Sequence, residues 1–88
     1  MSIIIEIPGH LFGLVDNHKT VEVNGKTIRE CLMSLASQYP GMLPELFDIS
    51  GRLAVIVLKG GESVDDGMID LPVEDGDTLE LFPIIVGG

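Results

Sequence analysis

The chain contains short stretches in which apolar and polar residues alternate, and this pattern predicts strands with one buried face. Residues 2–7 show the pattern first, and residues 19–23 repeat it. These two strands are expected to form an antiparallel pair with an unusually long connection, residues 9–18, which predicts a loop that packs apolar side chains onto the domain edge. The buried face of the first strand would consist of Ile3, Ile5 and Ile7.

Two further stretches complete the predicted sheet. Residues 53–58 are apolar without interruption, which is typical of a strand buried on both faces. Residues 78–82 alternate again, so Leu79 and Leu81 are expected to face the core. That alternation turns Phe82 outward, where an exposed aromatic side chain can bind a partner protein. The alternative is that sheet twist or the long loop covers Phe82.

One stretch has the periodicity of a longer helix, and a capping pattern marks its start. Thr27 and Glu30 have the spacing at which each side chain accepts a hydrogen bond from a backbone N–H of the first turn. The helix is expected to end before Pro40, and residues 44–47 predict a short helical turn. The buried stripe of the longer helix would consist of Ile28, Leu32, Leu35, Ala36 and Tyr39. Strands before and after one main helix indicate an α+β fold in which the helix covers a sheet.

Length and charge narrow the possible functions. The 88 residues predict one domain, in which 14 Asp and Glu against 5 Lys and Arg give a net charge of −9. This charge opposes binding to nucleic acid or to an anionic membrane and favours a basic protein partner. The longest apolar run is too short to span a bilayer, and the first residues lack the charged start of a secretory signal. A single cysteine, Cys31, fits a reducing compartment, so we expect a cytoplasmic protein.

The side chains form no recognisable catalytic or metal-binding set in the sequence. Only His10 and His18 carry imidazoles, and the aspartates within residues 65–77 lack the ligand spacing of a calcium loop. Residues 60–61 are a glycine pair without the rest of a phosphate-loop motif, so they predict a turn. Cys31 is interpreted as a packed apolar side chain. We therefore expect that the chain itself binds no metal and no cofactor.

The final residues predict an extended arm that leaves the domain. They are Pro83, Ile84, Ile85, Val86, Gly87 and Gly88. Proline interrupts regular structure, and β-branched residues favour an extended chain. Because glycine has no Cβ, a narrow active site can close around the last two residues, and a nucleophile can approach the terminal carboxylate carbon. The alternative is a frayed terminus whose glycines only avoid clashes.

Four short motifs together resemble the MoaD/ThiS family of ubiquitin-like sulfur carriers. They are Leu71, Asp75-Gly76-Asp77, Leu81-Phe82-Pro83 and the closing Val86-Gly87-Gly88. The resemblance extends over the whole chain and implies a ubiquitin-like β-grasp fold, in which a mixed sheet wraps over one helix and the first and last strands are parallel neighbours. Residues 1–82 would form this domain, and residues 83–88 would form the extended tail.

The resemblance also implies a role for the tail. In such carriers an E1-like activating enzyme adenylates the carboxylate that corresponds to Gly88, and a sulfur donor converts it to a thiocarboxylate. Gly87 would be the neighbour that leaves space for this chemistry. ATP and the sulfur donor are used through the partners, which supply all catalytic groups. The residues expected to bind partners are Phe82, Pro83, Ile84, Ile85 and Val86.

Several recipients of the sulfur are compatible with the sequence. The MoaD branch is the small subunit of molybdopterin synthase, and it supplies the dithiolene sulfurs of molybdopterin through the large subunit. Phe82-Pro83 favours this branch, although Ile84 stands where MoaD-like tails often carry a second proline. Other branches serve thiamine, cysteine or tungsten-cofactor synthesis. A ubiquitin-like modifier that is conjugated to lysines, and an interaction domain whose tail does no chemistry, are the alternatives to a carrier.

Overall fold

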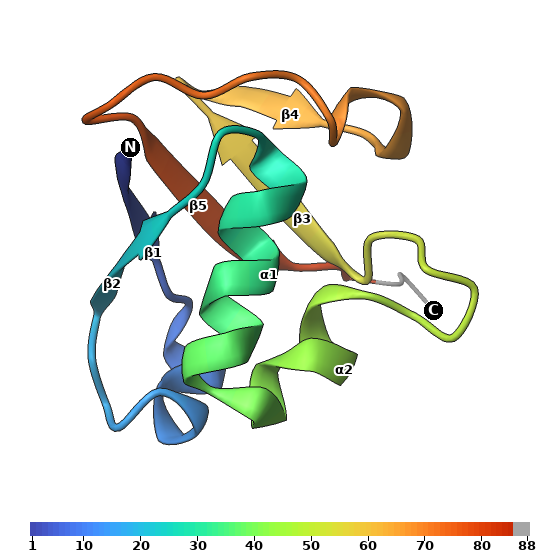
Figure 1. Cartoon of the computed structure of the whole chain (residues 1–88). Coiled ribbons are helices and arrows are strands. Elements are labelled where there is room, and N and C mark those ends of the chain that lie inside the picture. Colours follow the sequence, from blue (N-terminus) through green and yellow to red (C-terminus); the bar gives the residue numbers. More distant parts are fainter. Residues whose placement is uncertain (86–88) are drawn as a thin grey trace.

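The computed structural model describes residues 1–85, which form a sheet with helices packed against one face (Figure 1). The strands are β1 (Ser2–Glu6), β2 (Thr20–Asn24), β3 (Val55–Lys59), β4 (Glu62–Val64) and β5 (Thr78–Pro83). The α-helices are α1 (Ile28–Gln38) and α2 (Leu43–Leu46), and the 3-10 helices are η1 (Gly9–Leu14), η2 (Pro40–Met42) and η3 (Asp66–Met68).

The sheet is mixed, and its order across the described chain is β2-β1-β5-β3-β4. β1 and β5 are parallel neighbours, whereas the pairs β1–β2, β3–β5 and β3–β4 are antiparallel. Parallel neighbours need a crossover connection, and the segment that contains α1 supplies it over one face of the sheet (Figure 1). This arrangement confirms the predicted α+β, ubiquitin-like β-grasp fold with its first and last strands side by side.

The core lies between the sheet and the helices, and the predicted faces of the strands fill it. The buried side chains of β1, of the residue after it and of β5 are Ile3, Ile5, Ile7, Leu79 and Leu81. The buried side chains of α1 are Ile28, Cys31, Leu32, Leu35 and Ala36. Tyr39 was expected to complete this stripe but is only partly buried, because α1 ends at Gln38 and the backbone of Tyr39 is not helical.

The predicted cap of α1 is present in a modified form. The Thr27 hydroxyl accepts a hydrogen bond from the Glu30 N–H at 3.1 Å. The Glu30 carboxylate accepts a hydrogen bond from the Lys26 N–H at 3.2 Å. In the usual motif the donor is the backbone N–H of the capping residue itself, which here is Thr27. The Thr27 cap satisfies a backbone donor that the helix itself leaves unpaired, and such a cap contributes about 1 kcal/mol to stability.

The prediction that residues 53–58 form a strand buried on both faces is wrong in two respects. β3 begins only at Val55, because Leu53 instead forms an isolated bridge to the residue after α2. Val55 and Val57 are buried, but Ile56 between them is 37% exposed. The helices cover only the face to which the two valines point, so the opposite face of β3 is open.

Residues 9–18 are more regular than the predicted loop. η1 is a 3-10 helix, and the flanking bonds from Leu11 N–H to the Pro8 carbonyl and from Val15 N–H to the Phe12 carbonyl measure 3.0 and 3.1 Å. Leu11 and Val15 belong to the core rather than to the domain edge, since they are 3% and 0% exposed. Short 3-10 segments are common connectors, and their poorer hydrogen-bond geometry keeps them brief.

Two predicted turns are confirmed, and one of them introduces a strand that the sequence did not predict. Gly60 and Gly61 form the two-residue connection between β3 and β4, with φ of +59° and +82°. These positive values suit a tight hairpin and favour glycine. β4 has only three residues, which is too few for a pattern of alternation to be recognised. In the other turn, Asp75-Gly76-Asp77, the glycine has a φ of +88°.

Candidate functional site

β5 brings the predicted partner-binding residues to one end of the sheet. It lies between β1 and β3, and its buried residues Leu79 and Leu81 fix it in the core. The alternation along the strand then points Phe82 to the open face, where its side chain is 42% exposed, as predicted. Pro83 is the last residue of β5, one residue beyond the predicted strand, and it pairs with Val55 of β3.

Phe82 belongs to an apolar patch that the sequence prediction did not include. Ile56 pairs directly with Phe82 in the antiparallel ladder, and Leu58 lies two residues further along β3 on the same face. We call Ile56, Leu58 and Phe82 the sheet patch. Because the pattern of residues 53–58 indicates a strand buried on both faces, it does not predict that Ile56 and Leu58 point outward. If the sheet is instead assumed to be covered on one face only, alternate residues of β3 are expected to face solvent, and these two positions can be predicted.

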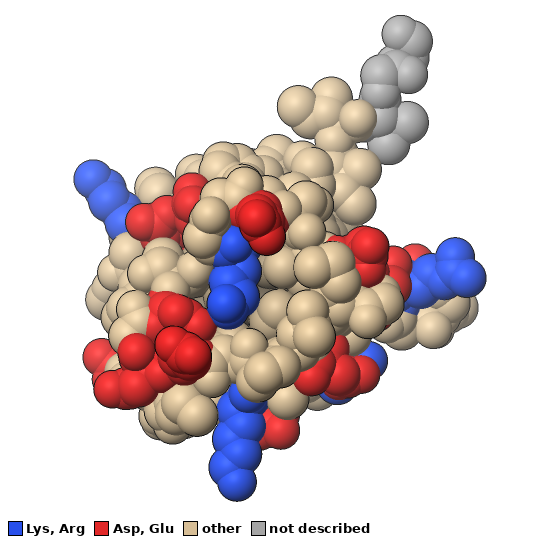
Figure 2. Space-filling model, turned by 90° about the horizontal axis from the view of Figure 1, so that it is seen from above, with Lys and Arg blue, Asp and Glu red and all other residues tan. Residues whose placement is uncertain are grey.

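Acidic side chains border the sheet patch. Glu6 and Glu80 are paired across β1 and β5 on the open face, and Glu80 is also the partner of Leu58 in the β3–β5 ladder. Like charges in neighbouring positions repel one another, so a cationic group of a partner would relieve this repulsion. Figure 2 shows that further acidic side chains are spread over the face seen from above, with basic side chains between them. The border of the patch therefore fits the basic partner that the net charge predicts.

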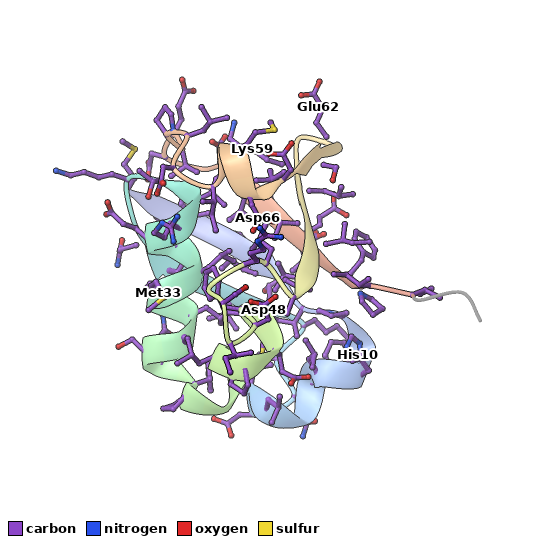
Figure 3. The ribbon with its side chains drawn as sticks, turned by 90° about the vertical axis from the view of Figure 1, so that its right-hand side faces the viewer. His10, Met33, Asp48, Lys59, Glu62 and Asp66 are labelled. Atoms are coloured by element: carbon purple, nitrogen blue, oxygen red, sulfur yellow. The ribbon has the colours of Figure 1, made fainter. Side chains whose placement is uncertain are left out.

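Beyond β5, the described chain continues with two exposed isoleucines. Ile84 is 49% exposed and Ile85 is 84% exposed. Figure 3 shows that the chain leaves β5 on the side away from α1, so this segment extends from the open side of the sheet. Val86, Gly87 and Gly88 lie outside the described residues. The extended arm and the reactive carboxylate therefore stay predictions.

The acidic turn before β5 has a structural role. The Asp75 carboxylate accepts a hydrogen bond from the Ser2 N–H at 2.7 Å, and the Asp77 carboxylate accepts one from the Glu74 N–H at 2.8 Å. The Gly76 N–H donates to the Ser2 carbonyl at 2.8 Å, so the turn is bonded to the start of β1. These bonds fix how β5 enters the sheet, and they thereby set where the tail leaves it.

The other candidate residues do not form a site. His10 lies in η1 and His18 lies after it in the same connection between β1 and β2, and both are exposed. Within residues 1–85, no group of three or more His, Cys, Asp and Glu side chains could hold a metal ion. Cys31 is buried, and this burial raises the pKa of its thiol, which keeps the thiol protonated at neutral pH. Among the helices described over the same range, none is long and apolar enough to cross a membrane.

The arrangement offers a docking surface and a strand end. β1 pairs with β5 only as far as Glu80, whereas β3 pairs with it as far as Pro83. On the β1 side, the last residues of β5 therefore have no strand partner within the described part of the chain. An extended partner segment could add to this edge, which is a common way of binding a peptide through its backbone. The sheet patch would supply side-chain contacts next to that edge.

Comparisons with known proteins agree with this geometry. The sequence model of the ThiS family matches residues 5–88. CysO from Amycolatopsis orientalis, solved in complex with BexX, is 27% identical, with a TM-score of 0.83 over 98% of this chain and 99% of that chain. SAMP1 from Haloferax volcanii is 26% identical, with a TM-score of 0.83 over 100% of both chains. No curated protein shows significant similarity in sequence.

A third structure shares the fold at lower identity. The complex of subunits 1 and 2 of the molybdopterin-converting factor from Helicobacter pylori contains a chain that is 16% identical, with a TM-score of 0.64 over 100% of both chains. Both this structure and that of CysO are complexes with another protein. Because the family model covers nearly the whole sequence and the described fold agrees with it, the chain belongs to the ThiS family and is a sulfur carrier of the ThiS/MoaD type.

Proposed function

We propose that the chain carries sulfur as a thiocarboxylate on Gly88. The observation that supports this most directly is the family match, which runs to residue 88 and so includes the glycine pair. The terminal carboxylate has a reference pKa near 3.5, so it is an anion at neutral pH, and one oxygen must first become a leaving group. An activating enzyme would transfer AMP from ATP to that oxygen and release pyrophosphate. A sulfur donor would then displace AMP and leave a carbon–sulfur bond.

The described residues support a role in docking, with the catalytic groups in the partner. The sheet patch lies at the end of β5, and Phe82 is only six positions before Gly88 in the sequence. An enzyme that binds the sheet patch therefore holds the origin of the tail at a fixed place. Holding reactants in this way replaces a bimolecular encounter with a local one, which is a large part of many rate enhancements. Gly87 would allow the active site to close around the backbone.

Two recipients of the sulfur are supported by different observations. The Phe82-Pro83 sequence at the end of β5 supports a molybdopterin synthase large subunit, to which this chain would be the small subunit. The higher identity to CysO, 27% against 16% for the molybdopterin-converting factor, supports a recipient of the kind that CysO serves. Offering the purified thiocarboxylate to each recipient enzyme and its sulfur-free substrate would separate them. Sulfur transfer to a molybdopterin precursor assigns the first recipient, and its absence excludes it.

A second candidate function is protein modification. It is favoured by the likeness to SAMP1 of Haloferax volcanii, a small archaeal modifier protein, at 26% and 25% identity in two crystal structures. In this case the amine of a target lysine would attack the activated Gly88 carbonyl carbon, displace AMP and form an amide. Cell extracts should then contain conjugates of high molecular weight that disappear when Gly88 is deleted. A carrier that only delivers sulfur would form no such conjugates.

The mass of the intact protein tests the proposed carrier function. With an activating enzyme, ATP and a sulfide source, the chain should gain the mass by which sulfur exceeds oxygen. Deletion of Gly88 should abolish this gain without altering the circular dichroism spectrum. Cys31→Ala is the matched control, because Cys31 is the chain's other site at which sulfur could be held, and this variant should still be sulfurated. Sulfuration of the truncated chain, or its loss in Cys31→Ala, would contradict the proposal.

A further inference from the structure

A second apolar surface lies on the helix side of the molecule, on the layer opposite the sheet patch. It is a groove of about 430 Å³ lined by Leu43, Pro44, Phe47, Asp48 and Ile49. α2 forms one wall of this groove and the loop that follows α2 forms the other. The groove is shallow and open to solvent rather than enclosed. We call these five residues the α2 groove.

Some apolar side chains of the α2 groove are exposed to solvent and do not contribute to the core. Ile49 is fully exposed and Leu43 is 44% exposed, whereas Leu46 on the same short helix is completely buried. Phe47 is partly buried and packs against the core, so the floor of the groove is supported. Single exposed apolar residues are common on protein surfaces, but a contiguous group of them marks an interaction site.

The loop that presents Ile49 is held in place by a set of hydrogen bonds. The Asp48 carboxylate accepts hydrogen bonds from the Ser50 N–H, the Ser50 hydroxyl and the Arg52 N–H at 2.9, 2.6 and 3.0 Å. The Asp48 N–H donates to the Arg52 carbonyl at 2.8 Å, and Gly51 closes the turn with a φ of +85°. Because the loop is already ordered, a partner that binds Ile49 would lose little affinity to ordering it.

Carboxylates form the margin of the α2 groove. Glu45 is exposed on α2, and the hydrogen bond from Ser50 lowers the pKa of Asp48, which favours its carboxylate form. The Asp66 carboxylate accepts a hydrogen bond from the Leu53 N–H at 2.7 Å, which brings a third acidic residue to the end of the same loop (Figure 3). Arg52 is the cation beside them, so the margin has a net negative charge.

We propose that the α2 groove binds an apolar peptide segment of a partner protein that is flanked by Lys or Arg. The apolar walls would hold aliphatic side chains, and the carboxylate margin is complementary to basic flanks. A second copy of this chain fits less well, because two chains that each carry −9 repel one another. The groove lies on the helix side of the sheet and the sheet patch on its open face, and the loop of the groove leads into Val55, the β3 partner of Pro83. The docking does not rest on the proposed function.

Peptide binding to the whole, isotope-labelled chain tests this proposal. Two synthetic peptides would share a Leu-Leu-Ile centre and differ only in their flanks, which are Lys in one and Glu in the other. We expect the Lys-flanked peptide to shift the backbone amide resonances of Leu43, Phe47 and Ile49 and to leave those of the sheet patch unchanged. Ile49→Ser should weaken its binding by about tenfold or more. Met33→Ser, at an exposed apolar residue of α1 outside both surfaces, should leave binding unchanged.

Reversing one charge at the margin separates specific docking from general attraction to an acidic protein. Glu45→Lys should weaken binding of the Lys-flanked peptide and strengthen binding of the Glu-flanked one. Equal binding of both peptides to the wild-type chain, shifts centred on the sheet patch, no shifts at all, or unchanged affinity in Ile49→Ser would each overturn the proposal. Deletion of Gly88 should leave peptide binding unaltered, so this result does not depend on whether the tail carries sulfur.

Discussion

Replacing Phe82 with alanine should weaken binding to the activating enzyme by an amount that the structure allows to be worked out. An aromatic side chain presents about 200 Å² of surface. Since Phe82 is 42% exposed, about 80 Å² of it is available to a partner, and at 25 cal/mol per Å² its burial is worth about 2 kcal/mol. The dissociation constant of Phe82→Ala should therefore rise about 30-fold.

Isothermal titration of the carrier into its activating enzyme measures this change directly. Ile49→Ala is the matched control, because it removes an exposed apolar side chain from the opposite layer and should leave the dissociation constant unchanged. Urea denaturation of each variant checks that the fold is retained. If Phe82→Ala folds normally and binds with the affinity of the wild-type chain, the sheet patch is not part of the interface.

Two further predictions concern stability. Gly25→Ala should lower the free energy of unfolding by about 1–3 kcal/mol, since its Cβ would lie 2.8 Å from the backbone nitrogen of Cys31. Gly13→Ala is the control for thermal denaturation, because nothing lies within 4 Å of its Cβ, and equal losses in the two variants would contradict this reasoning. The pKa of Asp48 is lowered, chiefly by the hydrogen bond from Ser50, so its contribution to stability is present above the unfolded pKa of about 4 and is lost as the pH falls through the folded value. Melting temperatures of Asp48→Asn and the wild-type chain should therefore converge as the pH falls from about 5 to below the folded pKa of Asp48, and a constant difference over this range would refute this.

The parts of the fold that the sequence predicts well are those with a one-sided pattern. On β1, Ile3 and Ile5 point to the core and Glu6 points away, which a strand with one covered face requires. On α1, the Thr27 cap and the buried stripe follow from local chemistry that does not depend on neighbours. On β5, the same alternation that buries Leu81 exposes Phe82, so the outward position of Phe82 follows from periodicity alone.

The parts of the fold that the sequence does not predict depend on which face of the sheet the helices cover. Ile56 looks like a core residue because its neighbours on both sides are apolar, and only the one-sided packing of the helices exposes it. The sheet patch is therefore missed at the sequence level. The α2 groove is missed for a related reason. Leu43 and Ile49 are widely spaced apolar residues in a segment without periodicity, and they form a surface only when α2 and the next loop are folded together.

The position of β5 in the middle of the sheet also determines how the domain resists a pulling force. A partner that grips residues after Pro83 pulls along β5, and that strand is bonded to β3 on one side and to β1 on the other. Force along the strand axis loads these bonds together as shear, whereas a strand peeled from an edge releases them one after another. Leu79 and Leu81 add the work of dragging two buried side chains past the core. If the tail enters an enzyme as proposed, we therefore expect the domain behind it to stay folded when the tail is withdrawn.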